Sequence, residues 1–109
     1  MSGSGSNSTR GIFAGGKNPS VNNIIDYITI ATLGDAADFG DLTSQRFQNC
    51  NTCFSATRGC FNGGSTTPAT VNTIDYVTIL STGNATDFGD LTLAPSGSAG
   101  TCSNAHGGL

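Results

Sequence analysis

The chain has 109 residues and a formal net charge of −3; only 10% of its residues are charged, and it contains no tryptophan. A chain of this length forms one small domain at most, and a hydrophobic content of 36% excludes a large core. Four basic residues against seven acidic ones disfavour a phosphate-neutralising surface, and no apolar run reaches membrane-spanning length. We therefore expect neither nucleic acid nor a membrane as a partner.

Residues 1–8 are polar, and we expect them to form an N-terminal arm ahead of the folded part of the chain. This segment lacks the basic start and the apolar centre of a signal peptide, so no signal peptide is visible.

The next segment occurs twice. The sequence from Thr9 to Thr43 returns from Thr57 to Thr92 after about 48 residues, with Thr67 inserted and more than half of the aligned residues identical. Such a period in a Gly-rich, β-branched sequence indicates a repeat architecture, in which each unit buries its faces against its neighbours. We place repeat 1 at residues 9–56 and repeat 2 at residues 57–98.

Each repeat begins with two predicted strands. The first, Arg10 to Ala14 or Arg58 to Asn62, runs into a glycine pair that ends the strand in a turn. The second, Ile24 to Ala31 or Thr73 to Leu80, is rich in β-branched and aromatic residues, which predicts the central strand of a sheet.

Side chains alternate between the two faces of a strand, and here both faces carry apolar groups. Ile25 and Tyr27 lie on one face of the predicted central strand, and Ile28 and Ile30 lie on the other. We therefore expect the sheet to be covered on both faces.

Each repeat ends with the motif DFGDLT, which predicts the last strand of a hairpin. Phe39 and Phe88 are the expected buried anchors of this strand. The acids recur at equivalent positions: Asp26, Asp38, Asp41, Asp75, Asp87 and Asp90. Carboxylates in this number are compatible with a glycosidase or a calcium site.

We expect a structural use for these acids, because an active site needs different residues in different roles and both repeats carry the same set. In this interpretation the carboxylates hold backbone N–H groups in turns and contact Arg10 or Arg58 on a neighbouring strand. The predicted structural residues are Arg10, Phe39, Asp41, Arg58, Phe88 and Asp90.

The C-terminal segment aligns with the start of repeat 2, since GTCSNAHGG lies over NTCFSATRG. We therefore predict a last strand within residues 99–109. If the repeating unit has four strands, this strand supplies the missing piece of the first unit, in its own chain or in a neighbouring one.

The four cysteines allow three interpretations. Cys50, Cys53, Cys60 and Cys102, with His106, are a possible zinc-binding set. The expected alternative is small buried side chains in strands, and Cys53 and Cys60 also form a possible disulfide across a hairpin. We predict no metal and no cofactor, because Cys53 and Cys102 occupy equivalent repeat positions, as buried side chains in strands do. We also predict no catalytic residue, because no serine or cysteine nucleophile has an identifiable base.

The glycine pair after an apolar strand, followed by a tyrosine and a later aromatic residue, resembles the blade of a kelch-type β-propeller. The longer phrase from TRGIFAGG to DFGDLT is similar to tandem repeats of bacteriophage tail fibres and related structural proteins. These resemblances imply an all-β fold of two tandem four-stranded blades of about 48 residues, completed by oligomerisation or strand exchange.

Two functions follow from this interpretation. The expected one is a non-enzymatic structural protein that self-assembles by strand exchange into a ring or fibre, in a virion or another extracellular assembly. The alternative is a lectin-like module that binds a glycan or a receptor through its loops. The candidate binding residues in those loops are Lys17, Asn18, Asn22, Ser65 and Thr66.

Overall fold

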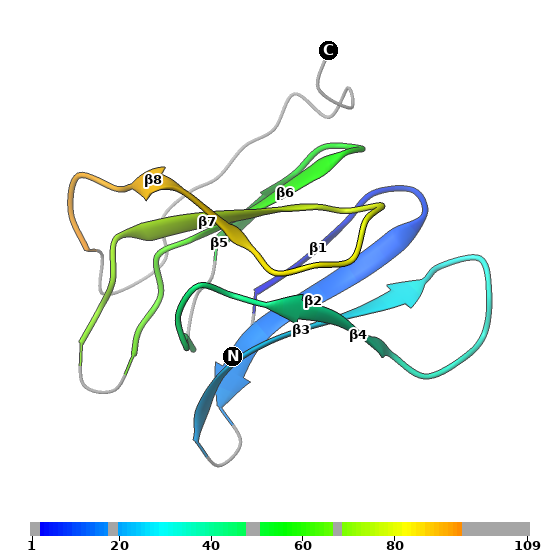
Figure 1. Ribbon diagram of the computed structural model, residues 1–109, viewed down its shortest axis with the longest axis horizontal. Helices are drawn as coiled ribbons and strands as arrows, with labels where there is room; N and C mark the ends of the chain where they lie inside the picture. Colours follow the sequence, from blue (N-terminus) through cyan, green and yellow to red (C-terminus); the bar gives the residue numbers. More distant parts are fainter. Residues whose placement is uncertain (1–2, 18–19, 48–50, 67–68, 95–109) are drawn as a thin grey trace.

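The computed structural model describes residues 3–17, 20–47, 51–66 and 69–94, which form an all-β fold (Figure 1). The first sheet has the strand order β1-β2-β3-β4, the second has the order β5-β6-β7-β8, and every neighbouring pair is antiparallel. The strands are β1 (Gly3–Ser6), β2 (Arg10–Lys17), β3 (Val21–Thr29), β4 (Ala37–Asp41), β5 (Asn51–Phe54), β6 (Arg58–Asn62), β7 (Thr73–Thr78) and β8 (Thr86–Asp90). The predicted all-β class is confirmed, and each repeat contributes to a four-stranded sheet.

The N-terminal segment differs from the expectation of a separate arm. Gly3–Ser6 forms β1 and pairs along β2, from Gly3 opposite Ala14 to Ser6 opposite Gly11. Antiparallel pairing satisfies the backbone hydrogen-bonding groups without any apolar side chain, so a GSGS segment is able to serve as a strand. The first sheet therefore obtains its fourth strand from this segment; the strand predicted within residues 99–109 lies outside the described residues.

The glycine pair of the first repeat does not end its strand as predicted. Gly15 and Gly16 have φ angles of 68° and 124°, and the register of β2 against β3 shifts between Ala14 and Gly16. The pair forms an irregularity of the kind that glycine permits, and β2 continues to Lys17. In the second repeat, β6 ends at Asn62 as predicted.

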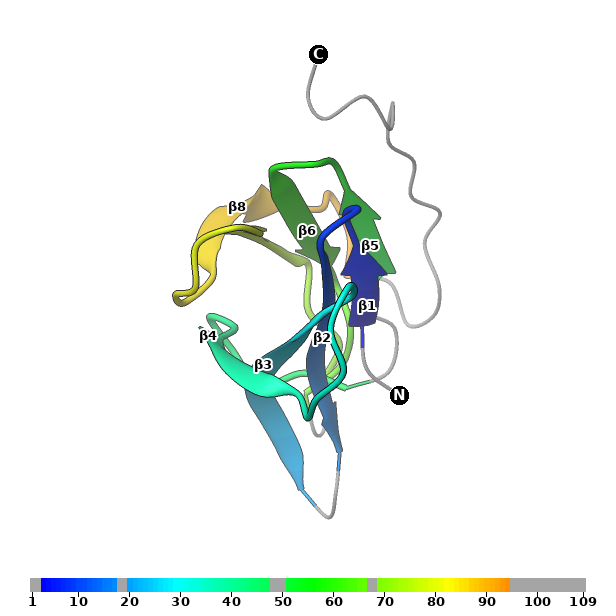
Figure 2. The ribbon, with the colours of Figure 1, turned by 90° about the vertical axis from the view of Figure 1, so that its right-hand side faces the viewer.

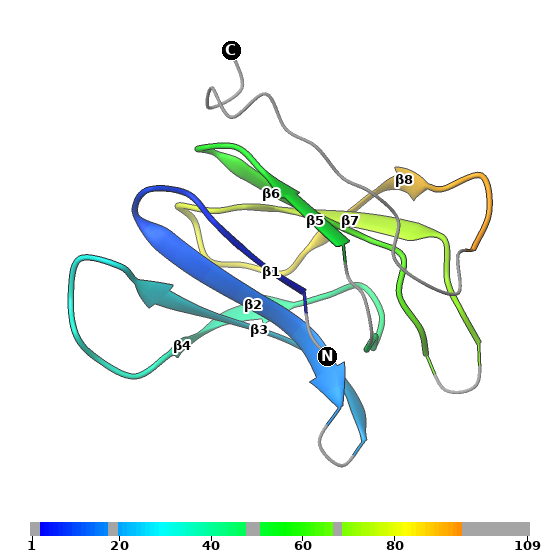
Figure 3. The same ribbon diagram turned by 180° about the vertical axis from the view of Figure 1, so that it is seen from behind.

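The two sheets face each other and share one core. Figures 2 and 3 show β1 and β5 side by side, where the Thr52 hydroxyl donates to the Ser4 carbonyl at 2.6 Å. The buried core residues come from both sheets: Ile12, Ala14, Ile25, Phe39, Leu42, Phe61, Val77 and Ile79. The expectation that each sheet is covered on both faces is wrong for the single chain, since Ile24 and Ile30 are exposed.

A second contact between the sheets lies at their other ends, where β4 meets the loop between β7 and β8. The amide of Gly83 donates to the Phe39 carbonyl at 2.8 Å, and the amide of Ala85 donates to the Asp41 carbonyl at 2.7 Å. The Asn84 side chain accepts a hydrogen bond from the Asp41 amide at 3.0 Å. The loop of the second repeat thus pairs with the last strand of the first.

This contact requires a glycine at position 40, and a matched pair of variants tests the requirement. A Cβ atom on Gly40 would lie 2.2 Å from the Gly83 carbonyl oxygen, whereas one on the equivalent Gly89 would meet nothing within 4 Å. Both glycines have similar φ angles, 152° and 154°, so alanine costs about 1–3 kcal/mol of backbone strain at either position.

We predict that Gly40→Ala lowers the free energy of unfolding by at least about 1 kcal/mol more than Gly89→Ala does. Urea denaturation at low protein concentration measures the difference. Equal losses in the two variants would contradict the close approach of Gly83 to Gly40.

Candidate functional site

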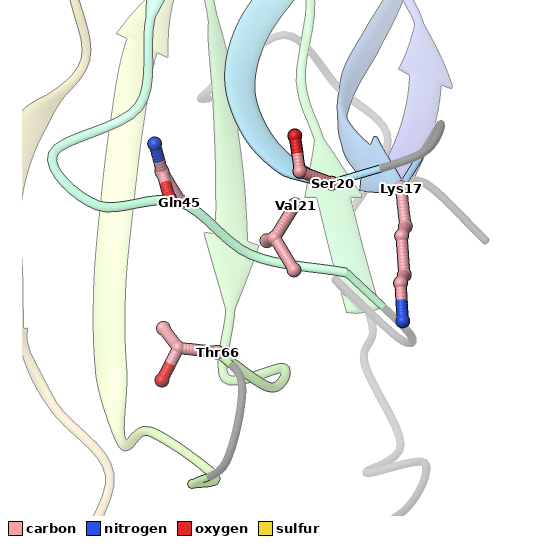
Figure 4. Close-up of a pocket in the computed structure, with 5 residues that line it drawn as sticks. All are labelled: Lys17, Ser20, Val21, Gln45 and Thr66. Atoms are coloured by element: carbon pink, nitrogen blue, oxygen red, sulfur yellow. The ribbon is translucent and has the colours of Figure 1, made fainter.

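A pocket of about 420 Å³ lies where the predicted binding loops approach the segment that follows β4 (Figure 4). Three segments contribute to it: the β2–β3 hairpin, the segment after β4 and the loop after β6. The lining residues are Lys17, Ser20, Val21, Gln45 and Thr66. Two of the five predicted binding residues, Lys17 and Thr66, therefore line one pocket.

The other predicted binding residues have different surroundings. Asn22 accepts the Arg46 amide through its backbone carbonyl at 3.1 Å and the Ile24 amide through its side chain at 3.3 Å. Ser65 forms a two-bond bridge with Phe47, at 2.9 and 2.8 Å. Both residues hold the backbone together beside the pocket, and Asn18 lies outside the described residues.

The pocket offers polar groups for binding a neutral or anionic polar ligand. The Lys17 ammonium lies 5.3 Å from the centre of the Phe47 ring, which positions the charge by a cation–π contact. The Thr66 hydroxyl donates to the Ala69 carbonyl at 3.2 Å, and its lone pairs remain able to accept. The five lining residues include no carboxylate and no thiol, and Lys17 is the titratable side chain among them.

Two smaller pockets occupy equivalent places in the two repeats. One, of about 140 Å³, lies at the loop between β3 and β4 and includes Tyr27, Thr32 and Asp35. The other, of about 230 Å³, lies at the loop between β7 and β8 and includes Tyr76, Ser81 and Asn84. Each repeat thus carries a similar polar pocket beside a tyrosine.

The sequence analysis missed a buried ion pair between the repeats. Arg46, after β4, pairs with Asp75 on β7, and both side chains are fully buried. Arg46 also donates to the carbonyls of Gly63 and Thr73 at 3.1 Å each. The Thr43 hydroxyl donates to the Asp75 carboxylate at 2.7 Å, and the Thr43 amide donates to it at 3.1 Å. These bonds compensate part of the cost of removing two charges from water.

The predicted partners of the acids are wrong. Within the part of the chain that the structure describes, Arg10 and Arg58 form no ion pair with an aspartate; each guanidinium lies 4.4 Å from the centre of a tyrosine ring, Tyr27 or Tyr76. Arg10 in addition donates to the Ile79 carbonyl of the other repeat at 2.9 Å. These contacts are structural ones, although not those predicted.

The two predicted phenylalanine anchors differ from each other. Phe39 is buried and meets Tyr27 edge to face, with ring centres 5.8 Å apart. Phe88 meets Tyr76 in the same way at 6.0 Å, but it is exposed, so its prediction as a buried anchor is wrong for the single chain. The physical reason is that the second sheet covers Phe39, whereas the described residues form no third sheet to cover Phe88. Asp41 and Asp90 are exposed beside them.

Cys53 and Cys60 lie directly opposite each other on β5 and β6, and both are free thiols in the structure. Burial raises the pKa of the Cys60 thiol above its ordinary value, and the neighbouring Cys53 raises it further. The disulfide between them stays a prediction. Cys50, Cys102 and His106 lie outside the described residues, within which no three His, Cys, Asp or Glu side chains gather as a metal site.

Comparison with known proteins adds no family: no protein-family model matches the chain, and no curated protein matches it. The described residues contain no helix with the length and hydrophobicity that a membrane-spanning segment requires.

The chain itself supplies a matched test of the ion pair, because Asp26 is the equivalent of Asp75 in the first repeat and has no such partner among the described residues. We predict that Arg46→Ala lowers the free energy of unfolding by about 3–5 kcal/mol, because it leaves Asp75 buried without its counter-charge. Asp26→Asn should change that free energy by less than about 0.5 kcal/mol.

Urea denaturation, with far-ultraviolet circular dichroism to report the folded fraction, measures both effects. A loss below about 1 kcal/mol for Arg46→Ala would show that the pair is open to water in solution.

Proposed function

We propose that this protein is a non-enzymatic structural repeat protein that self-assembles by packing its repeats against those of other copies. One observation carries the proposal. Phe39, Phe61 and Ile79 are at most 3% exposed because they lie between the two repeats. Their equivalents in the opposite repeats, Phe88, Phe13 and Ile30, are 56%, 44% and 52% exposed. Exposed apolar side chains whose equivalents in the other repeat are buried support association between copies.

In this proposal each four-stranded sheet is one blade, and further copies supply the further blades of a propeller ring or of a fibre. The consecutive order of strands in both sheets supports the assignment. Sheet packing takes the place of strand exchange as the proposed contact, because the first sheet already has a fourth strand, β1, from its own chain. The resemblance to phage fibre repeats supports a place in a virion or another extracellular assembly.

Two of the recurring acids have structural roles at the contact between the repeats. Asp75 holds Arg46 between the repeats, and Asp41 contributes its backbone amide and carbonyl to the contact with the β7–β8 loop. Asp26, the equivalent of Asp75, has no such partner within the described residues, so this use belongs to the second repeat. The proposal therefore assigns structural roles to the Asp75 carboxylate and to the Asp41 backbone.

The first test is the mass of the protein in solution. We predict that light scattering on a sizing column gives a mass above that of one chain, and that this mass rises with protein concentration. Phe88→Ser should lower the mass toward that of a single chain, because it removes exposed apolar area without touching the buried core. A single-chain mass for the unaltered protein at every concentration up to the solubility limit would overturn the proposal.

A second candidate function is glycan recognition, and the pockets favour it. The pocket of about 420 Å³ joins Lys17 and Thr66 from the predicted loops, and the two smaller pockets repeat from one sheet to the other. Polar pockets with hydroxyl, amide and tyrosine groups suit the hydroxyl-rich surface of a sugar.

We predict that, if this second function holds, a glycan array detects binding that Thr66→Ala weakens by about 2- to 12-fold, since a lost hydrogen bond costs about 0.5–1.5 kcal/mol. Asn22→Ala serves as the control, because the Asn22 side chain bonds to the backbone outside the lining. Absence of binding by the folded protein would leave the structural function alone.

A further inference from the structure

Each sheet has two unlike faces, and the strand register identifies their residues. Phe13 opposes Asp26 in the first sheet and Phe61 opposes Asp75 in the second, so each pair lies on one face, which we call the aspartate face. Ile28 and Ile30, or Val77 and Ile79, lie on the same face by alternation. The opposite face carries Ile12 and Tyr27 in the first sheet, or Cys60 and Tyr76 in the second, and we call it the tyrosine face.

Within the chain, unlike faces meet. The tyrosine face of the first sheet packs on the aspartate face of the second, which buries Ile12 and Phe39 against Phe61, Val77 and Ile79. The aspartate face of the first sheet and the tyrosine face of the second are left exposed at Ile30 and Phe88. One chain therefore presents both halves of the contact that it has already made once.

We propose that the tyrosine face of the second sheet of one copy binds the aspartate face of the first sheet of another copy. The inference rests on the proposed self-assembly and names its partner, a second copy of this chain, and its geometry, head to tail. Each exposed face has an equivalent inside the chain, and that equivalent is covered by a face of the other kind.

The polar contacts between the two sheets of one chain have equivalents at the proposed contact between copies. Arg10 donates to the Ile79 carbonyl inside the chain; its equivalent, Arg58, is exposed. The Ile30 carbonyl of the next copy is the corresponding acceptor for Arg58. Thr43 donates to Asp75 inside the chain. Thr92 and Asp26 are the corresponding pair between copies.

The close approach of the loop also has its counterpart. Inside the chain the Gly83 carbonyl lies over Gly40; at the equivalent Gly89, with a φ of 154°, the space is open. In the next copy, the loop at Gly34 is the equivalent of the Gly83 loop and would lie over Gly89. Asp35 stands where Asn84 accepts a backbone amide, and a carboxylate accepts such a bond as well.

At one position of the junction, the sizes of the two facing residues differ between the contact inside the chain and the proposed contact between copies. Inside the chain the Phe54 ring fills the space over Gly5, where an added Cβ would lie 2.1 Å from it. Between copies the equivalents are Ser6 and Cys53, so a smaller residue replaces the ring and a larger one replaces the glycine. Serine and cysteine together occupy less volume than phenylalanine and glycine, so this part of the contact between copies is less filled than its equivalent inside the chain.

One contact is not reproduced. The repeat alignment places Pro95 where the first repeat has Arg46, so Asp26 receives no guanidinium at a junction between copies. The contact between copies should therefore be weaker than the contact within a chain, and copies should separate on dilution while each chain stays folded.

Two half-blocked variants test the proposal. Ile30→Glu blocks the aspartate face of the first sheet, and Phe88→Glu blocks the tyrosine face of the second; both residues are exposed, so the fold tolerates the change. Each variant alone should associate at least about 30-fold more weakly than the unaltered protein, because assembly would bury an unpaired charge. Mixed together, they should form a one-to-one heterodimer that does not grow, since each keeps the face that the other lacks.

The controls are Ile30→Leu and Phe88→Leu, which keep an apolar group at each position and should retain assembly. A second readout locates the contact. In the heterodimer, alkylation of Cys60 should slow in the Ile30→Glu chain, whose tyrosine face is covered, and not in the Phe88→Glu chain. Mass spectrometry separates the two chains by their mass.

The outcomes separate this inference from the proposed function. An unaltered protein that assembles while the mixed variants form no heterodimer would overturn the pairing of faces and leave self-assembly standing. A heterodimer with equal alkylation of Cys60 in both chains would likewise overturn the assignment of the faces. A protein that never associates would overturn both.

Discussion

The ion pair between Arg46 and Asp75 exists only while the two repeats stay packed together. Both side chains are fully buried, and the two charges come from different repeats. If the two repeats separated, both charges would return to water. If only one of the two charges were removed, the other would stay buried without a partner and would carry a large desolvation penalty. The first repeat thus stabilises the second through the segment after β4, and this dependence favours cooperative folding of the two sheets as one unit.

The contact between the two repeats also makes the two repeats differ in which of their equivalent residues are buried. Residues that are nearly identical in sequence have opposite environments, since Phe39 is buried and Phe88 is exposed, while Ile79 is buried and Ile30 is exposed. A contact between unlike faces is heterologous, so it closes into a ring or continues as a fibre according to the rotation between neighbours. In either case the loops with their repeated pockets recur once per sheet, and the pocket of the second repeat includes Gly83 and Asn84, which also form the contact between the repeats.

The sequence predicted those features that repeat and depend on side-chain pattern. The β-branched runs identified β3 and β7, and the duplicated DFGDLT motif identified the hairpins.

The sequence did not identify β1, because GSGS has no hydrophobic alternation and pairs through its backbone alone. It also did not separate Phe39 from Phe88, because equal residues acquire different burial only through tertiary packing. Arg46 was missed because it follows the duplicated segment; an arginine between two repeats with recurring aspartates was the available signal. Of the predicted binding residues, Lys17 and Thr66 line a common pocket, since loop side chains follow the hairpins that carry them.

Backbone hydrogen exchange tests the contact between the repeats most directly. The amides of Gly83 and Ala85 lie in a loop, and their only acceptors in the described residues are carbonyls of the other repeat. At a concentration where the protein is a single chain, these two amides should be protected, whereas the equivalent amides of Gly34 and Ala36 should exchange freely. Fast exchange at Gly83 and Ala85 would contradict the packing of the two repeats, and with it the model of assembly through unlike faces.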